Sequence, residues 1–262
     1  MKFYVLTDVH GFYSEMLAAL EHQGFFRDAC PHKLVICGDL FDRGQEAVQL
    51  LNFLLNFPSD DLILVRGNHE DLMLDLLRDW SSQSYWQSHH QHNGTVDTVC
   101  QLTDSCEWDI MLKPQDVLDK MSESPLVTTI IPRMVDFFET KNYVFVHGWV
   151  PCFTDVTMSR YKTKDRSYKY DSDWREAAPH RWAAARWFNG MDAWRAGVIE
   201  PGKTIVCGHW HSSYGHAKFE GGTEFEVDSD FSPFYGEGII ALDACTAFSG
   251  QVNCLVIEDE PA

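Results

Sequence analysis

The chain has 262 residues and a formal net charge of −18, from 39 acidic and 21 basic residues. A protein this acidic repels polyanions at long range, which argues against a broad nucleic-acid interface. No apolar run reaches the ~20 residues of a membrane-spanning helix, and the eight cysteines show no paired CxxC spacing. We therefore expect a single cytoplasmic domain over residues 1–262 that needs no disulfides and binds neither nucleic acid nor membrane.

Short apolar runs of strand length alternate with helical patterns along the chain. In chain order the expected elements are a strand at 3–6, a helix at 14–22, a strand at 33–37, a helix at 45–57, a strand at 62–65, a helix at 70–80, and strands at 143–146, 204–207, 238–242 and 252–257. Strands that alternate with helices are typical of βαβ units. The pattern therefore predicts an α/β fold with a mostly parallel sheet.

Two stretches interrupt this alternation. Residues 81–133 are polar and carry helical patterns after the turn at Asn93-Gly94, and residues 151–202 are rich in Trp, Arg and Asp. Neither shows an internal repeat or a separate domain. We interpret both as insertions that form a partly helical cap beside the sheet.

Five of the apolar runs end in residues that can bind metal. These residues are Asp8 and His10 after the first strand, Asp39 after the second, Asn68 after the third, His147 after the run 143–146, and His209 and His211 after the run 204–207. The carboxyl ends of parallel strands form the binding edge of such a sheet, so we expect these loops to converge. The runs 238–242 and 252–257 show no ending of this kind.

The residue types in these loops predict a two-metal site. Hard divalent metals prefer carboxylate and amide oxygens, and imidazole suits manganese, iron or zinc. Two metals ~3.5–4 Å apart need one bridging carboxylate and terminal ligands on each side. Asp39 is the expected bridge, and the other six residues are the expected terminal ligands. Manganese is the favoured metal, with iron and zinc left open because the ligands do not discriminate among them.

The same residues form a set of sequence blocks. The blocks are Asp8-x-His10, Gly38-Asp39-x-x-Asp42-Arg43-Gly44, Gly67-Asn68-His69-Glu70, His147 and Gly208-His209-x-His211. Together they resemble the calcineurin-like metallophosphoesterases, and Asp42-Arg43-Gly44 is similar to the bacterial phosphoprotein phosphatase branch. This resemblance, which covers residues 8 to 211, implies an α/β fold with a central β-sandwich flanked by helices.

The resemblance also implies how the metals are shared. Asp8, His10 and Asp39 would hold the first metal, and Asp39 would hold the second together with Asn68, His147 and His209. In the wider superfamily a histidine at the position of His211 joins the first metal. Phosphoprotein phosphatases usually lack that histidine, so the chain departs from the branch at this position.

Three further roles follow from the resemblance. Asp42 would orient His69, which would protonate the leaving oxygen, and Arg43 would bind the phosphate. Family members bring a second phosphate-binding arginine from the later insertion. Arg186 is our candidate for it, and the competing candidates are Arg175 and Arg181.

The expected reaction is hydrolysis of a phosphomonoester by in-line attack of a metal-bound hydroxide. The favoured substrate is phosphoserine or phosphothreonine in a protein, and a small phosphate ester is the other possibility. One alternative is a symmetrical diadenosine tetraphosphate hydrolase. The signature of those enzymes usually lacks an aspartate at the position of Asp42. The other alternative is a catalytically inactive metal-binding scaffold. The sequence argues against it, because every expected ligand and catalytic residue is present.

Overall fold

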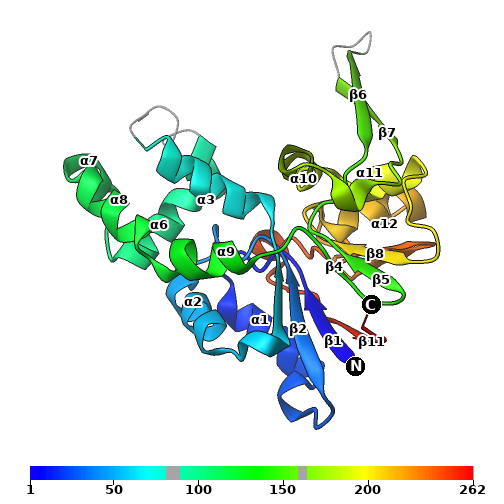
Figure 1. The fold of residues 1–262 in the computed structure, drawn as a ribbon, viewed down its shortest axis with the longest axis horizontal. Helices are drawn as coiled ribbons and strands as arrows, with labels where there is room; N and C mark the ends of the chain where they lie inside the picture. Colours follow the sequence, from blue (N-terminus) through cyan, green and yellow to red (C-terminus); the bar gives the residue numbers. More distant parts are fainter. Residues whose placement is uncertain (81–88, 159–163, 262) are drawn as a thin grey trace.

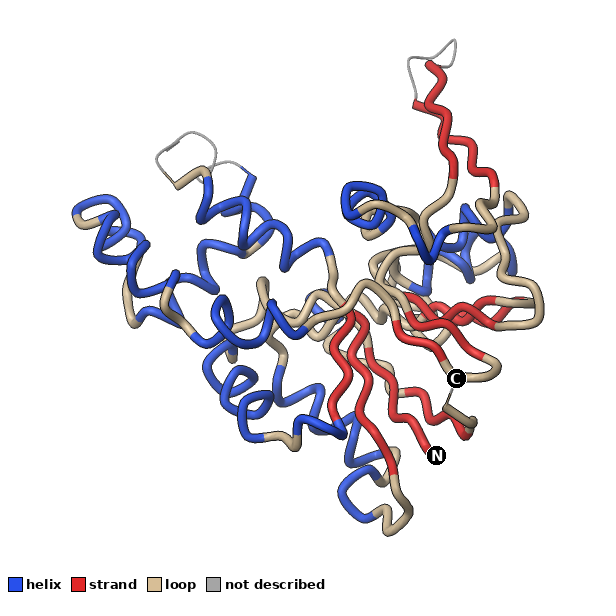
Figure 2. Tube along the Cα trace, in the orientation of Figure 1, coloured by secondary structure: helices blue, strands red, loops and turns tan. Residues whose placement is uncertain are grey.

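The computed structural model of the protein describes residues 1–80, 89–158 and 164–261. Two β-sheets occupy its centre, and helices lie on their outer faces (Figure 1). Coloured by secondary structure, the strands of the two sheets gather in the middle of the molecule, with most of the helices outside them (Figure 2).

The first sheet contains the amino terminus. Its strands in spatial order are β11 (Leu255–Glu258), β1 (Lys2–Leu6), β2 (His32–Cys37) and β3 (Leu62–Val65). β1, β2 and β3 run parallel, and β11 pairs antiparallel with β1 at the edge. The carboxyl ends of the three parallel strands therefore lie at the same edge of the sheet.

The second sheet has the same arrangement of a parallel centre and antiparallel edges. Its strands in spatial order are β4 (Phe138–Glu139), β5 (Tyr143–Phe145), β8 (Thr204–Cys207), β10 (Ile239–Ala241) and β9 (Phe234–Gly236). β5, β8 and β10 are parallel to one another, while β4 and β9 are antiparallel to their neighbours. All seven predicted strands are present.

The two sheets pack face to face through a shared apolar layer. This layer consists of Phe3, Val5, Val35, Cys37, Val65, Phe145, Val206, Leu242 and Ile257. Alternation along β1 explains it: Phe3 and Val5 face the second sheet, whereas Tyr4 and Leu6 belong to the cluster that includes the helices. The expected central β-sandwich flanked by helices is confirmed.

Helices cover the outer faces of both sheets. They are α1 (Tyr13–His22), α2 (Ala47–Asn56) and α3 (Asn68–Arg78) on the first sheet, and α10 (Pro179–Ala185), α11 (Gly190–Arg195) and α12 (Ser212–Glu220) on the second, with a short α13 (Thr246–Ser249) near the carboxyl terminus. The third helix begins two residues earlier than predicted. Asn68 and His69 therefore lie in its first turn, held by helical backbone rather than by a loop.

The insertion predicted at 81–133 is helical over its described part. Its helices are α5 (Gln91–Asn93), α6 (Thr95–Thr103), α7 (Glu107–Leu112), α8 (Pro114–Ser122), a π-helical turn (Leu126–Ile130) and α9 (Ile131–Arg133). α6 contacts α2 and α3, and so lies against the first sheet's helical layer. Residues 81–88 of this prediction lie outside the described residues.

The insertion predicted at 151–202 contains strands as well as helices. An antiparallel hairpin of β6 (Phe153–Met158) and β7 (Lys164–Lys169) projects from the body ahead of α10 (Figure 1). Thr154, Asp155 and Arg166 are exposed. The sequence of the two strands carries no alternation of apolar and polar residues that would have revealed them.

None of the described helices combines the length and the apolar character that crossing a bilayer would require. All eight cysteines are free thiols, as expected. The cytoplasmic location stays a prediction.

Candidate active site

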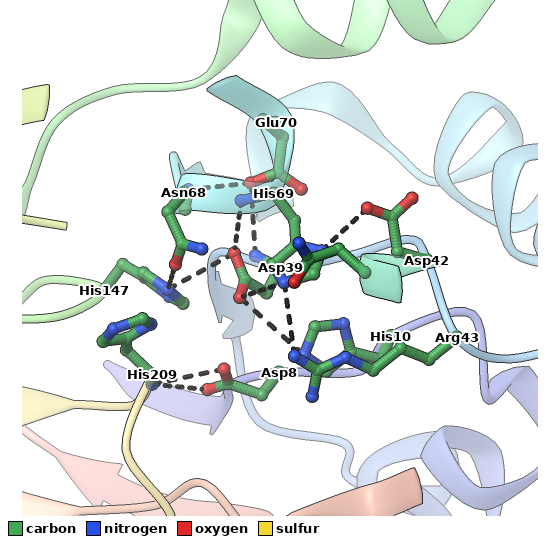
Figure 3. A network of polar contacts seen from close by, with 12 residues as sticks. Asp8, His10, Asp39, Asp42, Arg43, Asn68, His69, Glu70, His147 and His209 are labelled. Carbon is green, nitrogen blue, oxygen red and sulfur yellow. Dashed lines mark hydrogen bonds and ion pairs between the residues drawn. The ribbon is translucent and has the colours of Figure 1, made fainter. Parts of the chain in front are cut away.

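Loops from both sheets meet at the carboxyl ends of their parallel strands. Asp8, Asp39, Asn68, His147 and His209 follow β1, β2, β3, β5 and β8 and point toward a common centre (Figure 3). The first four are at most 2% exposed. The convergence predicted for these loops is observed, and it places five candidate metal ligands in one largely buried cluster.

Asp39 lies at the centre of this cluster. Its Oδ1 atom is 3.3 Å from Nε2 of His147, and its Oδ2 atom is 3.7 Å from Nε2 of His10. Two groups with ligand spacing share this carboxylate, one with His10 and His69 and the other with His147 and His209. A carboxylate held in common by two sets of donors is the arrangement that a two-metal site needs.

Backbone carbonyls orient two of the imidazoles toward the centre. Nδ1 of His10 lies 3.0 Å from the carbonyl oxygen of Phe41, and Nδ1 of His147 lies 2.8 Å from that of Cys37. A carbonyl can only accept, so each Nδ1 carries the proton and donates. Nε2 of each ring is thereby aimed at Asp39, as in metal sites where the second ring nitrogen is hydrogen-bonded outside the ligand shell.

Asn68 and Asp8 complete the cluster in different ways. Oδ1 of Asn68 is 2.8 Å from Nε2 of His147, so both donors face the same space. The Asp8 carboxylate accepts from the backbone N–H of His209, at 3.0 and 3.2 Å, and belongs to neither of the two ligand-spaced groups. A Cβ on Gly208 would lie 2.0 Å from Oδ2 of Asp8, so only glycine allows this approach.

The protonation states of two imidazoles suit metal binding. Burial lowers the pKa of His10 well below its usual value, and burial followed by the charge of His147 lowers the pKa of His209 to about 3. Both rings are therefore neutral at pH 7, which is the metal-binding form. Burial opposes charge on His147 and Asp39 too, but their mutual attraction raises the pKa of His147 and lowers that of Asp39. The donor set of carboxylate, amide and imidazole fits two divalent metals.

His69 and Asp42 form a hydrogen-bonded pair beside the cluster. Nδ1 of His69 lies 2.7 Å from Oδ2 of Asp42, and an Nη2 atom of Arg43 lies 3.4 Å from Nε2 of His69. Burial lowers the pKa of His69, but Asp39 and Asp42 outweigh it, so the pKa lies above its usual value. The ring can therefore carry a proton at neutral pH, next to an exposed guanidinium.

His211 lies apart from the cluster. Its Nδ1 atom is 2.8 Å from the Ser213 hydroxyl, its Nε2 atom is 3.2 Å from the Glu224 carboxylate, and its ring packs against Phe225. Both ring nitrogens thus have partners outside the site. To serve as a ligand of the first metal, one of these two nitrogens would have to leave its partner.

Arg186 is held by carboxylates. Its Nη1 atom is 2.7 Å from Asp71, and its Nη2 atom pairs with Asp136. The competing candidates are likewise paired, Arg175 with two glutamates and Arg181 with Asp171. The residue after Arg186 does reach the cluster, since the ring of Trp187 lies edge-on to that of His209 with centroids 5.7 Å apart.

Asp243 is a site carboxylate that the sequence patterns did not reveal. It is 7% exposed and follows β10, and its charge, after burial, raises the pKa of Asp8. Its Oδ1 atom accepts from the backbone N–H of Cys245 at 2.7 Å. The prediction that the run 238–242 lacks a polar ending was wrong. The signal was present, because Leu242 and then Asp243 follow the strand just as Asp8 follows β1.

Glu70 joins the second loop to the start of α3. Its buried carboxylate accepts from the backbone N–H groups of Gly67 at 2.7 Å, Leu40 at 2.9 Å and Asp39 at 3.2 Å. Three donors on one carboxylate hold the turn that presents Asp39. Glu70 therefore supports the site through the backbone that presents Asp39.

Glu70→Ala is expected to lower the Tm of the metal-free protein by at least ~5 °C. Hydrogen bonds to a charged group contribute ~1.5–3 kcal/mol each, and 1 kcal/mol shifts the Tm of a chain this size by ~2–4 °C. Thermal unfolding followed by circular dichroism measures it. Glu237→Ala, at an exposed position between β9 and β10, serves as control. Equal Tm values for the two variants would contradict this role for Glu70.

Comparisons with known proteins agree with the fold. The calcineurin-like phosphoesterase family model matches residues 1–213. A symmetrical bis(5'-nucleosyl)-tetraphosphatase of Methylococcus capsulatus is 24% identical over an alignment 291 residues long. The alignment covers 98% of this chain and 92% of that protein. An asymmetrical bis(5'-nucleosyl)-tetraphosphatase of Bacillus velezensis is 33% identical over 76 residues, 26% of this chain and only 30% of that protein.

Among solved structures, the cold-active protein-tyrosine phosphatase of a psychrophilic Shewanella species superposes with a TM-score of 0.53. It is 17% identical, and the match covers 98% of this chain and 75% of that one. At this identity the similarity concerns the fold alone. The family match over residues 1–213 is decisive: the chain belongs to the calcineurin-like phosphoesterase family and is a metallophosphoesterase.

Proposed function

We propose that the protein hydrolyses phosphomonoesters, with phosphoserine or phosphothreonine of a protein as the substrate. The observation that carries the proposal is the pair of His69 and Asp42, 2.7 Å apart and directly beside the Asp39 cluster. A monoester of serine or threonine has a poor alkoxide leaving group, which needs a proton as it departs. A protonated imidazole fixed by a carboxylate can supply that proton.

The proposed ligands are those with donor atoms at the cluster. Asp39 would bridge two divalent metals, and manganese is the favoured metal, with iron or zinc as the alternatives. Asp8 and His10 would hold one metal, and Asn68, His147 and His209 the other; His211 is the least supported of the proposed ligands because both its ring nitrogens face elsewhere. When bound, the metals supply positive charge and lower the pKa of a bound water.

The chain's own residues would bind the phosphate and move the proton. Arg43 is exposed and adjacent to His69, so its guanidinium can pair with the phosphate oxygens. His69 would donate its Nε2 proton to the departing oxygen, while Asp42 holds the opposite nitrogen. Arg186 would contribute a second guanidinium only after exchanging Asp71 or Asp136 for the phosphate.

A symmetrical diadenosine tetraphosphate hydrolase is the second candidate. A relative that matches nearly the whole chain carries that activity in its name. Two half-exposed tryptophans also flank His209: Trp187 is 42% exposed and Trp210 is 37% exposed, with both rings edge-on to that of His209. Exposed aromatic faces of this kind can stack on adenine.

A substrate panel separates the two functions. We expect kcat/KM for p-nitrophenyl phosphate and for a phosphothreonine peptide to exceed that for diadenosine tetraphosphate by at least ~10-fold, the effect of ~1.4 kcal/mol in the transition state. The assays use protein reconstituted separately with manganese, iron and zinc. A large preference for the dinucleotide would support the second candidate instead. Absence of turnover on every substrate with every metal would support the inactive scaffold.

A further inference from the structure

One helix of the first insertion lies directly on the loop that carries Asp42 and Arg43. α6 presents Thr95, Thr98 and Gln101 to this loop, at a spacing of three residues that places them on one helix face. Thr95 and Thr98 are fully buried. A row of hydrogen-bonding side chains on a buried helix face is costly unless each finds a partner.

The partners of the two threonines are on Asp42. The Thr95 hydroxyl donates to Oδ2 of Asp42 at 2.9 Å, and the Thr98 hydroxyl donates to Oδ1 at 2.7 Å. The Thr98 oxygen also accepts from the backbone N–H of Asp42 at 3.0 Å. Oδ2 is the oxygen that pairs with Nδ1 of His69. Both carboxylate oxygens of Asp42 are therefore held by hydroxyls of α6.

The remainder of the helix face holds the loop backbone. Gln101 accepts from the N–H of Ala47 and donates to the carbonyl of Gly44, both at 2.9 Å. At the start of α6, a Cβ on Gly94 would lie 2.3 Å from the backbone nitrogen of Arg43, so the two backbones are in close contact.

The loop needs this support because its conformation is unfavourable by itself. Asp42 has φ = 75° and Arg43 has φ = 64°, both in the left-handed region. Consecutive residues of this kind persist only where the surrounding structure holds them. α6 supplies that structure, through side-chain bonds to Asp42 and Gly44 and through contact with Arg43.

We propose that Thr95 and Thr98 are positioning residues for proton transfer to the leaving group. They hold the Asp42 carboxylate in one orientation, and Asp42 in turn directs Nε2 of His69 toward the leaving oxygen. This inference rests on the acid role of His69 in the proposed function. A carboxylate free to rotate would leave the imidazole poorly aligned, and small misplacements at a reacting centre lower rates strongly.

The test compares leaving groups. A good leaving group departs without a proton and a poor one does not, so loss of an aligned acid affects only the poor one. In the metal-loaded protein, Thr98→Val and Thr95→Val are expected to lower kcat by ~10-fold for a phosphothreonine peptide and for phenyl phosphate. For 2,4-dinitrophenyl phosphate the loss is expected to stay below ~3-fold. Thr98→Ser keeps the hydroxyl and should restore the rate on phenyl phosphate.

Thr103→Val is the matched control. Thr103 is also buried and in α6, but its hydroxyl donates to the carbonyl of Val99 within the same helix. The kcat of Thr103→Val should equal that of the wild type for every leaving group. Metal content and Tm, measured for each variant, show whether a loss of rate reflects lost metal or unfolding.

The variant His69→Asn separates the acid role of His69 from the positioning role of the two threonines. If its loss of rate grows with poorer leaving groups while that of Thr98→Val is absent or equal for all of them, the positioning role is overturned and the acid role stands. If His69→Asn itself shows no dependence on the leaving group, both are overturned. Parallel dependence in His69→Asn and Thr98→Val supports the proposal.

Discussion

Asp39→Asn is expected to lower kcat by at least ~10²-fold on p-nitrophenyl phosphate, the scale of a lost charge stabiliser. Asp39 is the carboxylate that both ligand-spaced groups share, one through His10 and the other through His147. An amide offers one neutral oxygen in place of the two that share the negative charge of a carboxylate, so it is a poor bridge between two cations. The buried imidazoles around position 39 would then lack the negative charge of the Asp39 carboxylate.

Metal content measured by plasma mass spectrometry alongside kcat makes this prediction specific. The variant should hold clearly less metal than the wild type after identical loading. Asp28→Asn is the matched control, since Asp28 also accepts from two side chains, Lys2 and Tyr4, but lies near the amino end of β1. Its kcat and metal content should match the wild type. Retention of full activity in Asp39→Asn would exclude the shared carboxylate as a metal bridge.

His69→Asn is expected to lower kcat by at least ~10²-fold for phosphomonoesters with poor leaving groups, the usual contribution of a general acid. Asparagine keeps a polar side chain next to Asp42 but has no proton that it can transfer. The backbone N–H of His69, which donates to Oδ1 of Asp39 at 2.9 Å, is retained. The turn that presents Asp39 should therefore stay intact, and the variant should fold.

Metal analysis of the same variant decides between two roles for His69. Its Nε2 atom lies 3.8 Å from Oδ2 of Asp39, close enough for His69 to be counted with His10 as a possible ligand. A general acid leaves metal content unchanged when it is replaced, whereas a ligand does not. His22→Asn, at the exposed end of α1, controls for loss of an imidazole elsewhere. Near-wild-type turnover in both His69→Asn and Asp39→Asn would contradict the proposed catalytic roles of both residues.

The β-sandwich explains why residues so far apart in the chain can form one site. Each sheet has a parallel centre, so the strands of a sheet end at the same edge. The apolar layer between the sheets, from Phe3 to Ile257, brings the two edges together. Asp39 from the first sheet and His147 from the second thereby come within 3.3 Å. The packing of the two sheets sets the distances and orientations of these side chains, and the loops after the strands contain the reactive groups.

Local patterns in the sequence were sufficient for the seven predicted strands and for the choice of candidate ligands, but not for β4, β6, β7 or β9. A strand and the residue after it are neighbours in the chain, so the alternation of apolar residues in β1 and the position of Asp8 can both be read locally. The same holds for Asp39 after β2 and His147 after β5. Blocks of this kind are sufficient to indicate the family.

Contacts between distant residues were decided only by the tertiary structure. Thr98 bonds Asp42 from 56 positions away, and Arg186 pairs with Asp71 from 115 positions away. No local pattern carries such pairings, because they depend on how the insertions pack against the first sheet. His211 has the spacing of a ligand, yet its bond to Glu224 directs it elsewhere. The sequence by itself determined which chemical groups reach the site, and packing determined which of them face one another.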